Sequence, residues 1–187
     1  GLVSAGFNEV VYTDTEDYRA LRYVIARGVN LQGFRIEGED GEKRSGVILA
    51  RLMGWWTDTQ EQDRKLDIAK YYVTRGKMQD LDEAVDGNGC TALYVASCRG
   101  HVDIVKGLVA AGANKDKAVN DDGATPLFIA AQEGHIEVVN ALIAARADLN
   151  KARDNGATPL YVAAWGHFEV VIALISAGAK VDKAVNN

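Results

Sequence analysis

The residues best suited to chemistry in this sequence are its three histidines, His101, His135 and His167. An imidazole can ligate a metal ion or act as a general base near neutral pH. Each histidine follows a glycine at the same place of a repeated segment, with spacings of 34 and then 32 residues. If these segments stack as helices, successive histidines lie ~10 Å apart, which is too far for one shared ion. We therefore predict a structural role for all three.

Two other patterns could indicate a cofactor or a reactive thiol. Gly87–Ala92 matches the spelling G-x-G-x-x-A, but a dinucleotide loop also needs a preceding buried strand and a long following helix. The glycines are better explained by a hairpin turn, which uses their permitted positive φ. Cys90 and Cys98 have neither a zinc spacing nor the pattern of a disulfide framework. We predict two ordinary thiols, no metal and no cofactor.

The carboxylates are numerous but do not form a catalytic constellation. Three of them, Asp103, Glu137 and Glu169, recur at the start of a predicted helix. A negative charge there stabilises the N-terminus of a helix electrostatically. No nucleophile–base pair and no phosphate-binding loop is recognisable in the sequence. We therefore predict that the protein is not an enzyme.

Composition and charge restrict the class of protein further. The chain has 187 residues, of which 48% are hydrophobic and 25% charged, so it can fold around a real core. The net charge of −5 disfavours nucleic-acid binding, since phosphate contacts need a basic surface. No apolar run approaches the ~20 residues of a membrane helix, although association with a membrane-protein complex stays open. The thiols favour an intracellular, reducing compartment, either cytoplasmic or organellar, and the non-methionine start fits a trimmed chain or a cleaved targeting peptide.

A repeated unit positions all of these residues. "GATPL" occurs at 123–127 and 156–160, and a blurred copy, "GCTAL", occurs at 89–93. Threonine is a good N-cap and proline fits the first turn of a helix, so a short helix is predicted after each copy. A second helix is predicted from about Ile136 to Ala145, because its apolar residues share one helical face. These residues are Val138, Val139, Leu142 and Ile143.

This TPL…AA…GH…VV…GA pattern resembles the ankyrin repeat. The resemblance implies an all-α solenoid of helix-turn-helix units joined by β-turn or hairpin loops. It is strong over 85–187, where three units are clear, and the third unit has one residue fewer in the turn that contains Trp165. We predict about five units in a single domain over 1–187, with the first two units, in 1–84, degenerate.

The degenerate part is assigned from weaker similarity. Residues 66–78 align with 102–114, whereas 33–44 and 57–65 are interpreted as polar insertions and 1–14 stay unassigned. Met53, Trp55 and Trp56 cluster before the second insertion. Two interpretations of this cluster stay open: the three side chains complete the core of a degenerate repeat, or they dock against a partner.

The resemblance also suggests where a partner would bind. Tyr94, Phe128 and Tyr161 recur at one place of the unit, and Trp165 is expected one helical turn after Tyr161. These aromatics either stack within the solenoid or contact a ligand on the concave face. The candidate contact residues on that face are Tyr94, Cys98, Arg99, Phe128, Gln132, Glu133, Tyr161 and Trp165. The hairpin tips add Asn88, Asp121, Asp122, Arg153, Asp154 and Asn155.

The resulting functional prediction is a non-catalytic scaffold that binds a protein through its concave face and hairpin tips. The alternative is a permanently assembled accessory or structural subunit of a larger complex, which could be organellar. The last predicted helix keeps Ile172 and Ile175 apolar instead of replacing them with polar residues. Because terminal repeats normally carry a polar outer face, we also predict that this end is covered in the working state.

Overall fold

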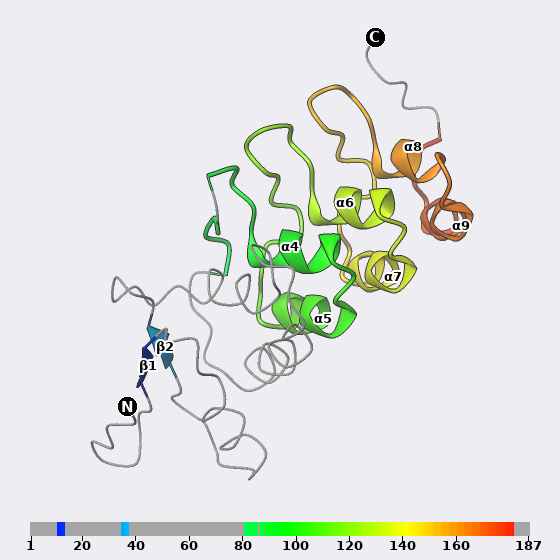
Figure 1. Cartoon of the computed structure of the whole chain (residues 1–187). Coiled ribbons are helices and arrows are strands. Elements are labelled where there is room, and N and C mark those ends of the chain that lie inside the picture. Colours follow the sequence, from blue (N-terminus) through cyan, green and yellow to red (C-terminus); the bar gives the residue numbers. More distant parts are fainter. Residues whose placement is uncertain (1–10, 14–34, 38–80, 86, 182–187) are drawn as a thin grey trace.

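The computed structural model describes residues 11–13, 35–37, 81–85 and 87–181 (Figure 1). Six short helices form three helix pairs within the described segment 87–181. The helices are α4 (Ala92–Cys98), α5 (Val102–Ala110), α6 (Pro126–Gln132), α7 (Ile136–Ala144), α8 (Pro159–Ala163) and α9 (Phe168–Ser176). Among the described residues, none of the helices has both the length and the apolar character needed to cross a membrane.

The helix pairs stack in two layers. The first helices, α4, α6 and α8, contact one another in sequence, and the second helices, α5, α7 and α9, form the other layer. Long loops project from the first-helix layer between successive units (Figure 1). This is the solenoid that the sequence predicted, and the second helix of the middle unit ends at Ala144, one residue before its predicted end.

Threonines begin the first helix of every described unit. Thr91, Thr125 and Thr158 each accept a hydrogen bond at 3.2 Å from the backbone N–H three residues later. Pro126 and Pro159 occupy the first helical position, where the missing N–H of proline costs nothing. The threonines are buried, so each cap also satisfies polar groups that water cannot reach. The predicted caps are confirmed.

The core runs between the two layers along the whole stack. Val138, Val139 and Leu142 of α7 are fully buried, as are their counterparts Ile104, Val105 and Leu108 of α5. Small alanines in the first helices, such as Ala130 and Ala131, are fully buried and allow close packing. A single helix pair cannot cover such a face, so each unit depends on its neighbours.

The third unit differs locally, as its shorter turn predicted. Helix α8 has five residues, whereas α4 and α6 each have seven. Gly166 in the following turn has a φ of 154°, whereas the corresponding Gly134 has 73°. The turn leaves Trp165 exposed.

Two short strands lie outside these units and were not predicted. β1 (Val11–Thr13) and β2 (Arg35–Glu37) pair in parallel, with Val11 opposite Arg35. From the sequence, the first segment was unassigned and the second was interpreted as part of a polar insertion. Three residues carry too short a pattern to indicate a strand, and the partner is distant in the sequence. The predicted features at 45–78, including Met53, Trp55 and Trp56, lie outside the described residues.

Candidate protein-binding surface

Backbone hydrogen bonds join the tips of successive loops into a continuous edge. The N–H of Asn120 donates to the carbonyl of Asn88 at 2.8 Å, and the N–H of Asp154 donates to the carbonyl of Asp122 at 2.9 Å. Both bonds connect one unit to the next. The tips therefore present their side chains from a fixed backbone, which a binding surface needs because ordering a loose loop would oppose association.

Some tip side chains are used to hold the loops. Oδ1 of Asp122 accepts from the N–H of Ala124 at 2.9 Å, and Oδ1 of Asn155 accepts from Ala157 at 3.0 Å. Arg153 forms an ion pair and hydrogen bond with Asp122 of the preceding loop. Asn88, Asp121 and Asp154 are exposed. Asn155 is also exposed, so it both holds its loop and presents a polar group to solvent.

Phe128 differs from Tyr94 and Tyr161, the other aromatic residues that recur at this place of the unit and were predicted as contact candidates. Its side chain is only 1% exposed, and the guanidinium carbon of Arg153 lies 5.1 Å from the centroid of its ring. Because the next unit supplies this cover, the ring cannot contact a partner. The prediction that Phe128 is a contact residue is wrong, and its role is packing within the solenoid.

Tyr94 and Cys98 are half-buried on the first unit. Burial raises the pKa of the Tyr94 phenol, and nearby thiols and Asp122 raise it further, so its hydroxyl stays protonated near neutral pH. Burial also raises the pKa of the Cys98 thiol, with a further increase from the Glu133 carboxylate. A raised pKa lowers the thiolate fraction and makes Cys98 a poor nucleophile.

Tyr161 and Trp165 form an exposed aromatic pair at the last unit. Their side chains are 41% and 79% exposed, and the ring centroids lie 6.3 Å apart in an edge-to-face arrangement. Trp165 therefore lies close to Tyr161, as the spacing of one helical turn predicted. We refer to these two residues as the aromatic pair.

Three further candidate residues are polar and lie at the ends of the first helices α4 and α6. Gln132 is half-buried and its Nε2 donates to Oε1 of Glu133 at 3.1 Å. Glu133 itself is exposed, as is Arg99 of the first unit. These three candidates occupy the turns that end the first helices.

Two of the histidines join neighbouring units through hydrogen bonds. Nε2 of His135 donates to the carbonyl of Cys98 at 2.9 Å, and Nε2 of His167 donates to the carbonyl of Gln132 at 2.8 Å. The turns also fit closely around the rings: a Cβ added to Gly100 would lie 2.8 Å from Nδ1 of His135. Within the described ranges, no three His, Cys, Asp or Glu residues are grouped to hold a metal ion.

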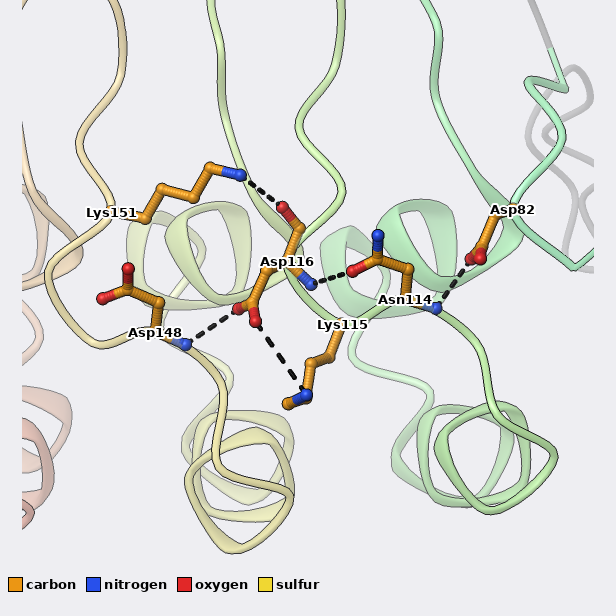
Figure 2. Close-up of polar contacts among 6 residues, drawn as sticks. All are labelled: Asp82, Asn114, Lys115, Asp116, Asp148 and Lys151. Carbon is orange, nitrogen blue, oxygen red and sulfur yellow. Dashed lines mark hydrogen bonds and ion pairs between the residues drawn. The ribbon is translucent and has the colours of Figure 1, made fainter.

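A second set of contacts, which was not predicted from the sequence, joins successive loops (Figure 2). The backbone N–H of one loop donates to a side-chain oxygen of the preceding loop: Asn114 to Asp82 at 2.7 Å, Asp148 to Asp116 at 2.8 Å and Lys180 to Asn150 at 2.7 Å. Lys151 also donates to the Asp116 carbonyl at 2.6 Å. The signal was present, since the three acceptors are 34 residues apart.

Comparison with known families agrees with this geometry. A family model described as ankyrin repeats, in three copies, matches residues 61–153 and 116–185. The match includes well over half of the chain, so the chain belongs to the ankyrin repeat family. It begins at residue 61, before the segment 66–78 that aligns with 102–114. Ankyrin repeats are generally protein–protein interaction modules and typically have no catalytic activity. No curated protein matches the chain.

Proposed function

We propose that this protein is a non-catalytic scaffold that binds a segment of a partner protein across the first-helix layer and the hairpin tips. The aromatic pair is the observation that carries the proposal. Tyr161 and Trp165 combine large apolar surfaces with polar groups, and such side chains dominate binding energy at protein interfaces.

The hairpin of the last unit and the helix-ending turn of the preceding unit carry exposed polar residues. Asp154 and Asn155 are exposed on the hairpin of the same unit, and Glu133 is exposed in the turn before it. An apolar centre with a polar border is the usual anatomy of an interface. Since two of these three residues are acidic, the expected ligand is a helical or extended segment with basic residues beside an apolar anchor.

Selection from a displayed library of random peptides tests this proposal even before the partner is identified. Peptides enriched on the chain should combine an aromatic or aliphatic anchor with lysine or arginine. Their affinity should fall when Tyr161→Ala or Trp165→Ala removes one ring, by about 1–3 kcal/mol if that ring is a hot spot. Fluorescence anisotropy with a labelled selected peptide gives the affinities.

A matched control separates the proposed surface from the rest of the solenoid. Lys106 is exposed on α5, in the second-helix layer. Lys106→Ala should leave peptide affinity unchanged, and thermal midpoints of all variants should stay close to that of the parent chain. Equal affinities for the parent and both aromatic variants would contradict the proposed surface.

A second candidate function is a permanent subunit of a larger complex, favoured by the exposed apolar side chains of α9. Gel filtration of native extract discriminates between the two, because a subunit co-elutes with a large assembly and a transient binder does not. Under either function we propose a reducing compartment, cytoplasmic or organellar. The support is that Cys90 is buried and Cys98 half-buried as thiols rather than in a disulfide.

A further inference from the structure

The turns that end the first helices present a different side chain in each unit. Arg99, Glu133 and Trp165 each stand directly before the glycine of such a turn, and all three are exposed. Arg99 and Glu133 are the C-cap residues of α4 and α6, and Trp165 follows the C-cap of α8. Because α4, α6 and α8 contact one another in that order, a cation, an anion and an aromatic ring follow one another along the stack. We refer to these three residues as the turn row.

The two charges of the turn row lie on the same side of the stack, because both act on one thiol. Cys98 is half-buried at the end of α4. Burial raises the pKa of this thiol, the Glu133 carboxylate raises it further, and the Arg99 guanidinium lowers it. Charges from two successive units thus reach the Cys98 thiol. One ligand segment that crosses this thiol can therefore meet both of them.

The spacing of the stack favours one backbone conformation for such a segment. Packed helices lie ~8–10 Å apart, so the ligand must present one side chain on the same face at each such step. A polyproline II helix does so, because it repeats every three residues, or ~9.3 Å. In a β-strand, residues three apart cover ~10 Å but point to opposite faces. An α-helix needs about seven residues, or ~10.5 Å, for each step, which exceeds the spacing.

We propose that the turn row binds a polyproline II segment in which every third residue is a contact. In order, these contacts are an apolar side chain for Trp165, a lysine or arginine for Glu133, and an aspartate or glutamate for Arg99. The inference rests on the proposed function, because the aromatic pair supplies the apolar contact, and it adds an acidic residue and a fixed spacing to the ligand. Exchanging the two charges of the ligand would place like charges together at two turns, so their order provides specificity.

A panel of labelled proline-rich peptides tests this pattern on the full chain by fluorescence anisotropy. The first peptide carries tryptophan, lysine and glutamate in that order, each three residues after the last. A second peptide exchanges lysine with glutamate, and two others change the spacing to two or four residues. The first should bind about three- to tenfold more tightly than each of the others, the effect of two exposed charge pairs. Equal affinities across the panel, or tightest binding at another spacing, would overturn the pattern.

Exchanging the charges on the protein tests the positions assigned to them. Arg99→Glu combined with Glu133→Arg should reverse the preference between the first and second peptides. Lys106→Glu combined with Glu137→Arg makes the matched exchange on exposed residues of the second-helix layer and should leave the preference unchanged. Thermal midpoints establish that both variants are folded, and Glu133→Gln provides a smaller change that should reduce the preference.

The two proposals fail in distinguishable ways. If library-selected peptides bind and lose affinity in Trp165→Ala, the proposed function stands whatever the panel shows. A peptide preference that the Arg99 and Glu133 exchange does not alter would then overturn the turn row alone. Failure of the library to yield any peptide that depends on the aromatic pair would instead overturn the proposed function and the turn row with it.

Discussion

The guanidinium carbon of Arg153 lies 5.1 Å from the centroid of the Phe128 ring, although the two residues belong to different repeats. The same guanidinium forms an ion pair with Asp122 in the preceding hairpin. Arg153 therefore connects its own hairpin to both the loop and the first helix of the unit before it. The junction between these units therefore includes the buried ring of Phe128.

The contribution of this junction can be measured with a double-mutant cycle. Arg153→Ala and Asp122→Ala should together destabilise the chain by less than the sum of their separate effects, because either change removes the same ion pair. We expect a coupling energy of about 0.5–1 kcal/mol, since both side chains are partly exposed. Urea unfolding of the four chains gives the value. Strict additivity would show that the ion pair contributes nothing.

The half-buried hydrogen bond from His135 to the carbonyl of Cys98 should contribute measurably to stability. His135→Ala removes the donor to the Cys98 carbonyl and leaves that acceptor without its partner. We expect the free energy of unfolding to fall by about 1–2 kcal/mol. Lys106→Ala, on the solvent side of α5, serves as the control and should change it by less than about 0.5 kcal/mol. Equal small effects of the two changes would show that the link is not stabilising.

Two glycines allow steric fit to be separated from backbone conformation. Gly100 and Gly112 both have positive φ, 71° and 96°, so alanine is strained at either position. Only Gly100 has a neighbour within 4 Å of an added Cβ, namely the His135 ring. Gly100→Ala should therefore be more destabilising than Gly112→Ala by about 1–3 kcal/mol in thermal or urea unfolding. Adding His135→Ala to Gly100→Ala should reduce the difference.

Phe128 and Tyr161 occupy equivalent positions of successive units, but Phe128 is buried and Tyr161 is exposed. Phe128→Ala should cost about 3–5 kcal/mol of stability, because it leaves a cavity in the core. Tyr161→Ala, at the same position of the next unit, should cost less than about 1 kcal/mol while weakening the binding of a selected peptide. Paired measurements of thermal midpoint and affinity decide the matter. A large loss of stability in Tyr161→Ala with unchanged affinity would show that Tyr161 contributes to packing and not to peptide binding.

The stability of the chain should fall at alkaline pH partly through Tyr94. Burial raises the pKa of this phenol in the folded state, so the neutral form is favoured there. The resulting stability is fully present below the unfolded phenol pKa of about 10 and is lost as the pH rises toward the folded value. Unfolding free energies measured across this range should fall less steeply in Tyr94→Phe. Identical slopes in the two chains would contradict the assignment.

The repeat architecture was predictable because it depends on patterns within each unit. Thr125 followed by Pro126 marks the start of a helix, and the buried face of α7 follows the helical period. The shorter turn at Trp165 was also evident from the sequence, since one residue is missing there. The organisation of 1–187 as one domain stays a prediction, because much of 1–80 lies outside the described residues.

The environment of each candidate contact residue was harder to predict. Phe128 and Tyr161 have equivalent places in the sequence, yet Arg153 covers only Phe128, and that contact comes from the following unit. The loop acceptor Asp116 recurs at a spacing of 34 residues with Asp82 and Asn150, but its donor, the N–H of Asp148, is a backbone group, so the spacing alone does not indicate which group it pairs with. Exposure and pairing therefore depend on neighbours in space, which periodicity alone does not reveal.

The loop contacts have an evolutionary consequence. Asp82 and Asp116 accept hydrogen bonds from donors in the next unit, each 32 residues later in the chain. A gene duplication that copied one whole unit would supply both a new donor and a new acceptor, and every junction would again be complete. Insertions of a few residues within a unit would shift this register. Chains of this kind can therefore lengthen by whole units while the older junctions keep their geometry.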